Sequence, residues 1–171
     1  ASYGVSQSST VISSTSGAVD ITGQGGTSTN SKSWGVNLAY GPISASTGVT
    51  IMGTAGTAAV SSTGTRISGE TISTTNGDLA VTGIMPAGKT AIQLAANAKL
   101  QTGGAGDIAL IGDAIEIDGS TTIDAGANTV FLTTITAGTN IEFGPADFSG
   151  TLGLTDAELD TVIAGTVQVG N

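Results

Sequence analysis

The sequence predicts an all-β protein whose chain coils into a triangular, parallel β-solenoid. Three observations support this prediction: glycines recur at a nearly constant spacing, short segments between them alternate apolar and polar residues, and large side chains are scarce. The recurring glycines close four similar phrases and are separated by almost equal intervals: Gly23, Gly53, Gly83 and Gly112. Regular periods of this length are typical of repeat architectures.

Each period holds three short segments. Alternation such as Val19/Ile21 and Leu79/Val81 places one face of a strand inward and the other in water. We expect three strands per turn, with glycine at a corner because a sharp bend often needs a positive φ. An antiparallel β-sandwich also has many short strands, but it predicts no three-strand period. The segments of the first four turns are 3–7, 10–13 and 18–22; 34–38, 42–45 and 49–52; 65–68, 71–74 and 78–81; and 91–94, 99–101 and 107–110.

The turns contract after Gly112. The sequence predicts one domain, 1–171, with about six to seven turns. The turns over 1–112 are longer, each about as long as the glycine interval. The turns over 113–171 are shorter and more acidic. The fifth turn comprises 115–117, 122–124 and 129–132, the sixth passes through 135, 141–143 and 152–154, and a partial seventh ends at 166–170.

One short helix is expected near 156–163. Thr155 and Glu158 have the spacing of a capping box, in which each side chain bonds the backbone of the other residue. Leu159, Val162 and Ile163 would form its apolar face, so we expect a corner element that covers the core.

The composition restricts the function. The 171 residues include 13 acidic and 4 basic residues, no His and no Cys, and the net charge is −9 at pH 7. A phosphate-binding surface needs clustered Lys and Arg, so nucleic acid is not an expected partner. No stretch approaches the roughly 18 apolar residues of a membrane span, so membrane insertion is not expected either. Without His and Cys, the chain lacks imidazole bases, thiolate nucleophiles and the usual zinc ligands.

Four acidic residues lie close together in the sequence with no basic residue near them: Asp113, Glu116, Asp118 and Asp124. Hard carboxylate oxygens suit Ca²⁺, so these four are candidate calcium ligands, and we expect no other cofactor. The alternative is a solvated acidic face that keeps the protein soluble.

Two further patterns bear on enzymatic function. Residues 83–90 match the P-loop pattern, in which Lys89 would reach nucleotide phosphates. Gly83 is already explained by the repeat, however, and no strand–helix units follow to build the α/β sheet of such a site. Polysaccharide-cleaving sites generally need aromatic platforms or basic groups, and Tyr3 and Trp34 are remote from the acidic turns. Because these two rings occupy equivalent repeat positions, we expect them to stack on adjacent turns.

Some phrases of the chain also point to a family. Residues 3–5, 14–23 and 69–83, and 152–160 followed by 164–170, resemble the repeats of very large bacterial surface proteins of the filamentous haemagglutinin type. The resemblance implies a right-handed parallel β-helix, export across a Gram-negative envelope to the cell surface or beyond, and adhesive or matrix roles. It implies no catalytic residues.

We therefore expect a structural or adhesive extracellular module and not an enzyme: a stiff β-solenoid rod of a surface protein, or the subunit of a filament or matrix. The alternatives are a polysaccharide lyase or hydrolase and a calcium-dependent glycan-binding module. The chain starts at a strand phrase and finishes at 167–169 without polar capping. We therefore expect continuation of a longer solenoid or head-to-tail self-association. A surface glycan or a host-cell receptor is a further expected partner.

Overall fold

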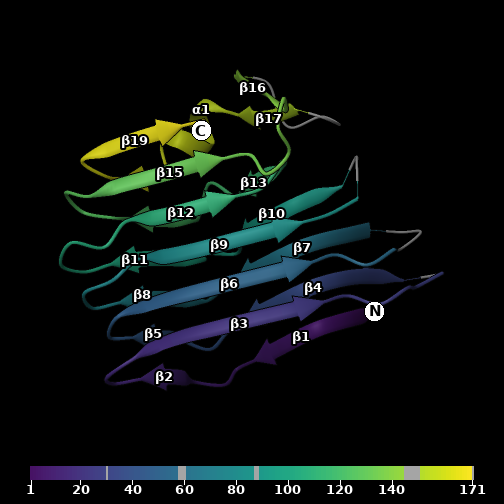
Figure 1. Ribbon diagram of the computed structural model, residues 1–171, viewed down its shortest axis with the longest axis horizontal. Helices are drawn as coiled ribbons and strands as arrows, with labels where there is room; N and C mark the ends of the chain where they lie inside the picture. The colour runs from purple at the N-terminus through teal and green to yellow at the C-terminus, as the bar shows by residue number, and fades with distance from the viewer. Residues whose placement is uncertain (30, 58–60, 87–88, 145–150, 171) are drawn as a thin grey trace.

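The computed structural model describes residues 1–29, 31–57, 61–86, 89–144 and 151–170, and it confirms a nearly all-β chain with stacked parallel sheets, the architecture of a parallel β-solenoid (Figure 1). In Figure 1 the strands at the front run to the right, namely β3, β6, β9, β12 and β15, and the strands behind them return to the left. The chain meanwhile climbs from β1 to β19, so the coil is right-handed, as nearly all parallel crossovers are.

Three parallel sheets, here called A, B and C, form the three sides of the coil. Sheet A stacks β1 (Ser2–Ser8), β4 (Lys32–Ala39), β7 (Ser61–Ser68), β10 (Thr90–Ala95) and β13 (Ile115–Ile117). Sheet B stacks β2 (Ile12–Ser14), β5 (Ile43–Ala45), β8 (Thr71–Thr74), β11 (Lys99–Thr102), β14 (Thr122–Asp124) and β18 (Val162–Ile163). Sheet C stacks β3 (Ala18–Gln24), β6 (Gly48–Thr54), β9 (Leu79–Ile84), β12 (Ile108–Ile111), β15 (Thr129–Thr133) and β19 (Thr166–Val169).

The last turn differs from the expectation. Val130 of β15 pairs directly with Val167 of β19, so the sixth turn is a long one and 166–170 belongs to it, not to a seventh turn. The extra length contains a separate two-stranded parallel sheet, formed by β16 (Asn140–Phe143) and β17 (Thr151–Leu154). The fifth turn is short, as predicted, because the partner of Ile108 in the next turn is already Val130.

The expected helix is present but shorter. Helix α1 comprises Asp156–Leu159, and the Thr155–Glu158 capping box is formed as predicted. Residues 162 and 163 are not helical: Val162 pairs with Ile123 and extends sheet B. Ile163, expected on the apolar face of the helix, is exposed instead. The β-branched pair favours a strand, and an open strand partner was available to it.

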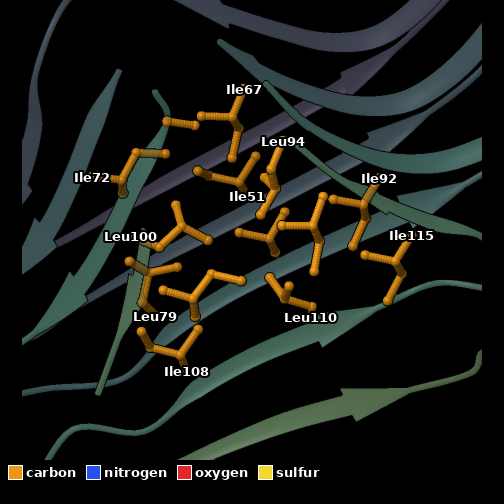
Figure 2. Close-up of a cluster of buried hydrophobic side chains, with 14 of the residues drawn as sticks. Ile51, Ile67, Ile72, Leu79, Ile92, Leu94, Leu100, Ile108, Leu110 and Ile115 are labelled. Carbon is orange, nitrogen blue, oxygen red and sulfur yellow. The ribbon is translucent and has the colours of Figure 1, made fainter. Parts of the chain in front are cut away.

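The core consists of rows of aliphatic side chains that run along the stack, one residue per turn (Figure 2). In sheet C, for example, Ile21, Ile51, Val81 and Leu110 are aligned by the register. Figure 2 shows how side chains from the three sheets fill the narrow interior between them. Such a row needs only one kind of residue at one position per turn, which explains the limited set of side-chain types in the sequence.

A seam of very small residues joins sheet C to sheet A, and we call it the glycine seam. A Cβ atom on Gly53 would clash with the carbonyl oxygen of Gly64, and one on Gly64 would lie 2.6 Å from the backbone nitrogen of Ile84. The backbones of the two sheets are therefore in direct contact, with no room for side chains between them. The members of the seam alternate between sheets C and A: Gly23, Gly35, Gly53, Gly64, Gly83 and Ala91.

The repeat glycines thus have a different cause from the expected one. Gly23, Gly53 and Gly83 lie inside strands and none has a positive φ. Left-handed backbone occurs instead at corners, for example after the first four strands of sheet A, where three of the four residues are not glycine: Ser9, Tyr40, Gly69 and Ala96. Close backbone approach, not bending, requires the recurring glycine.

Substituting Gly53 by alanine tests the seam. The added methyl group meets backbone atoms that cannot rotate away, so we expect the free energy of unfolding to fall by about 3 kcal/mol or more, the upper end of overpacking effects. Denaturant titration followed by circular dichroism measures it. The matched control is Gly119→Ala, because nothing lies within 4 Å of a Cβ there. Equal stability of the two variants would contradict the seam.

Candidate functional site on the outer face of sheet A

One polar or aromatic side chain from each of five successive turns contacts the next along the outer face of sheet A. We call this series the axial file. Its members are Tyr3, Trp34, Arg66, Gln93 and Glu116, from strands β1, β4, β7, β10 and β13. Because parallel strands lie about 4.8 Å apart, side chains of this size bridge adjacent turns. The file therefore runs along the stack and links all five strands of the sheet.

Trp34 is the aromatic centre of the file. Its ring centroid lies 5.1 Å from that of Tyr3, which confirms that the two rings meet on adjacent turns, but their planes are tilted by 58° and are not stacked as expected. The Lys32 ammonium lies 5.3 Å from the Trp34 centroid and the Arg66 guanidinium carbon 5.4 Å from it. Two of the four basic residues of the chain are thus placed over one indole ring, where the quadrupole of the ring attracts them.

Arg66 connects the aromatic end of the file to its polar end. Its Nη1 donates to the side-chain oxygen of Asn37 in the turn below, and its Nε donates to the Gln93 oxygen in the turn above, both at 3.1 Å. The Nη2 atom donates to the Ser68 hydroxyl at 3.1 Å. The planar guanidinium thereby fixes three partners on three strands, which a lysine ammonium on its flexible stem could not do with the same geometry.

The upper end of the file includes one of the predicted calcium ligands. Gln93 Nε2 donates to Glu116 Oε2 at 2.9 Å, and the Thr90 hydroxyl donates to Glu116 Oε1 at 2.7 Å. Both carboxylate oxygens of Glu116 are therefore used within sheet A. Its neutral neighbour Gln93 separates this carboxylate from Arg66.

The other three predicted ligands serve nearby backbone groups. Asp118 accepts from the Ser120 amide at 2.8 Å, and hydrogen bonds from the Ser120 hydroxyl and amide hold the pKa of Asp118 below its ordinary value. Asp124 accepts from the Gly126 amide at 3.0 Å. Such bonds, to an amide a little further along the chain, are typical of aspartate in turns.

Asp113 anchors the loop that follows β15. It accepts from the Ile135 and Thr136 amides, both at 2.9 Å, and from the Thr136 hydroxyl at 2.6 Å. Partial burial acts to raise the pKa of Asp113, but these hydrogen bonds and one from Thr139 outweigh it and hold the pKa below its usual value. This carboxylate stabilises a turn-to-turn contact.

The structure brings only two of the four candidates together. A hollow of about 250 Å³ beside β10 and β13 is lined by Glu116 and Asp118, and also by Glu158, which the sequence indicates only as a helix-cap residue. In the part of the chain that the structure describes, no group of three or more Asp, Glu, His or Cys side chains is placed to hold a metal ion. The four carboxylates therefore do not form one ligand set.

The apparent P-loop is divided between two strands. Gly83 belongs to β9 and Thr90 begins β10, whereas Gly88 lies outside the described residues. Residues 91–100, which a nucleotide site would need as a helix, comprise most of β10, a corner at 96–98 and the start of β11. The oriented helix N-terminus of a phosphate site is therefore not built from this segment.

Glu70 is a buried carboxyl group that the sequence interpretation did not single out. Its side chain is only 2 % exposed, at the corner between sheets A and B. Oε2 accepts from the Gly41 amide at 3.4 Å, and Oε1 has no hydrogen-bond partner among the described residues. Burial raises the pKa of Glu70 to about 7, although the Gly41 hydrogen bond acts to lower it. The register offers a signal: Glu70 stands at the position of Gly41 and Ala98 in the adjacent turns, both small and both buried.

Comparisons with known proteins add no identity: no family model, curated protein or solved structure gives a significant match to this chain. In the described ranges, no helix is long and apolar enough to cross a membrane. The function must therefore be argued from the geometry of the solenoid itself.

Replacing Arg66 tests whether the file couples the turns. Arg66→Ala removes three hydrogen bonds and one cation–π contact, so we expect the free energy of unfolding to fall by about 2 kcal/mol. Arg66→Lys should recover less than half of this loss. Lys99→Ala, on sheet B, changes the net charge equally and should have little effect. If both alanine variants unfold at the same denaturant concentration, the file has no structural role.

Glu70 makes stability depend on pH. The unfolded carboxyl loses its proton near its ordinary pKa of 4.5, whereas the folded one keeps it until about pH 7. The folded state binds more protons between these values, so its stability should fall as pH rises from 4.5 to 7, by about 2–3 kcal/mol. Glu70→Gln should flatten this part of the profile and stabilise the protein at pH 7. Glu142→Gln, at an exposed position, is the control. An unchanged slope in Glu70→Gln would contradict the assignment.

Proposed function

We propose that this chain is a structural module of a bacterial extracellular or cell-surface protein, in which the solenoid forms part of a stiff rod or matrix. The observation that carries the proposal is the continuity of the core rows and of the glycine seam through successive turns. Each turn repeats the geometry of the previous one, so further turns can be added without a new core. A binding or catalytic domain does not need this property.

Stiffness follows from three kinds of contact between adjacent turns. Parallel backbone pairing connects each turn with the next in the three sheets. The glycine seam leaves no space for the backbones of sheets A and C to slide, and the axial file ties the outer face of sheet A. A coil whose turns are joined by strand pairing, by the glycine seam and by the axial file resists bending more than a coil held together by its core alone.

The first turn, at the lower edge of the stack, has features that favour pairing with a further strand. Val19 and Ile21 in the first turn are half-buried, whereas Val49 and Ile51, directly above them in the register, are at most 1 % exposed. Strand edges and apolar rows of this kind accept a further parallel strand. We propose that this strand comes from the preceding turn of a longer solenoid or from a second copy of the chain, stacked head to tail.

The adhesive and surface role rests on the resemblance to filamentous haemagglutinin-type repeats, and on a fold and composition that agree with it. The chain has no cysteine, so its folding is independent of the redox state of its compartment. Its net charge of −9 opposes nonspecific aggregation of an extended rod. The surface partner of the module is a glycan or a receptor in this proposal.

Sedimentation velocity over a range of protein concentrations tests head-to-tail stacking. We expect the sedimentation coefficient to rise with concentration, and electron micrographs to show particles longer than one unit. Ser13→Pro should prevent this association, because the proline nitrogen cannot donate a hydrogen bond from the lower edge of β2. Ser13→Ala is the matched control and should associate like the parent chain. A chain that stays monomeric at every concentration would contradict stacking of copies and leave only the longer solenoid.

A further inference from the structure

Sheet A ends one turn before the other two sheets. In the ranges that the structure describes, sheets B and C each contain six strands and sheet A contains five, of which β13 is the last. In the sixth turn, β17 and α1 lie at this end of the stack (Figure 1). The residues at this end therefore show which groups bond to the backbone of the last sheet A strand in place of a further strand.

The backbone of Ile117 in β13 faces that end. The next residue, Asp118, donates its amide hydrogen downward to the Leu94 carbonyl of the turn below, at 2.9 Å. Because amides alternate sides along a strand, the Ile117 amide points upward, where a sixth strand of sheet A would supply a carbonyl oxygen. Its partner is instead Oε1 of Glu158 in α1, at 3.0 Å. A side-chain oxygen thus replaces the missing strand.

Glu158 is held for this contact by its own helix cap. Its Oε2 accepts from the Thr155 amide at 2.9 Å and from the Thr155 hydroxyl at 2.8 Å. These bonds use one carboxylate oxygen and leave the other for Ile117. In β17, Leu152 and Leu154 are fully buried in the core cluster, so the segment that carries α1 is anchored by apolar packing.

From these contacts we infer that 151–160 is a cap that closes the upper edge of sheet A, with Glu158 as its positioning residue. A strand of another chain cannot pair with Ile117 unless it displaces Glu158. The edges that this end offers are those of β18 and β19, where Ile163 and Val167 are exposed. Among the described residues, this end therefore offers free edges in sheets B and C, so a stacked copy would pair there through its β2 and β3, and its β1 would meet the cap instead of a strand.

Hydrogen exchange at the Ile117 amide, resolved by NMR, tests the cap in the intact chain. We expect this amide to be protected in the parent protein and to exchange at least tenfold faster in Glu158→Ala. Glu158→Gln should restore part of the protection, because its amide oxygen can still accept from Ile117. Asp160→Ala removes the same charge next to α1 and should leave the rate unchanged. Amides of the glycine seam report whether each variant remains folded.

Each result of this experiment either supports or overturns the role of Glu158 in closing the edge of sheet A. If Ile117 stays protected in Glu158→Ala, or exchanges as fast in Asp160→Ala, Glu158 does not close the sheet edge. If Glu158→Ala unfolds the whole chain, Glu158→Asp decides instead, because its shorter side chain keeps the charge but does not reach Ile117. A rate at Ile117 equal to the parent's, relative to seam amides, would then overturn the inference. The consequence for assembly rests on the proposed rod function, but the exchange rate does not. A monomeric chain with the expected Ile117 behaviour would keep the cap and reject the stacking of copies.

Discussion

The contact of two backbones at the glycine seam is the constraint on which the rest of this solenoid depends. Where sheet C passes sheet A, the positions of Gly53 and Gly64 leave no volume for a methyl group. This contact brings the sheets so close that the interior is filled mainly by rows of aliphatic side chains. The narrow core, the scarcity of aromatic residues and the period of the sequence all follow from it, because each new turn must place small residues at the same two points.

The repeat could be predicted from the sequence because the seam leaves a visible trace, a glycine at a nearly constant interval. Its cause could not, since spacing alone does not distinguish a glycine that bends from one that permits contact. The secondary structure near residue 162 was also hard to predict, because one local pattern again fits two structures. Val162 and Ile163 fit the apolar face of a helix and also a strand, and only the free edge of Ile123 in sheet B decides between them. Pairing between strands so far apart in the sequence is invisible to local pattern.

On the outer surface, too, some contacts could be predicted from the sequence and others could not. Tyr3 and Trp34 could be paired from their equivalent positions, whereas Arg66 was missed although it follows the seam glycine Gly64 at the same spacing as Asn37 follows Gly35. The acidic residues were grouped because they are neighbours in sequence. In the coil three of these carboxylates instead accept hydrogen bonds from backbone amides, and Glu116 accepts from two side chains of sheet A. The spacing Asp118-Gly-Ser120 has the form of a turn.

The seam and the file constrain the coil in different ways. The seam and the core rows present nearly the same residues in every turn, so shifting one turn onto another would change little in the interior. The axial file does not repeat: a tyrosine, a tryptophan, an arginine, a glutamine and a glutamate occupy five successive turns. A shift by one turn would separate Arg66 from Asn37 and Gln93 and break the file. The repeated positions therefore permit stacking, and the unrepeated ones select which turn stacks on which, a problem that every repeat protein with a uniform core must solve.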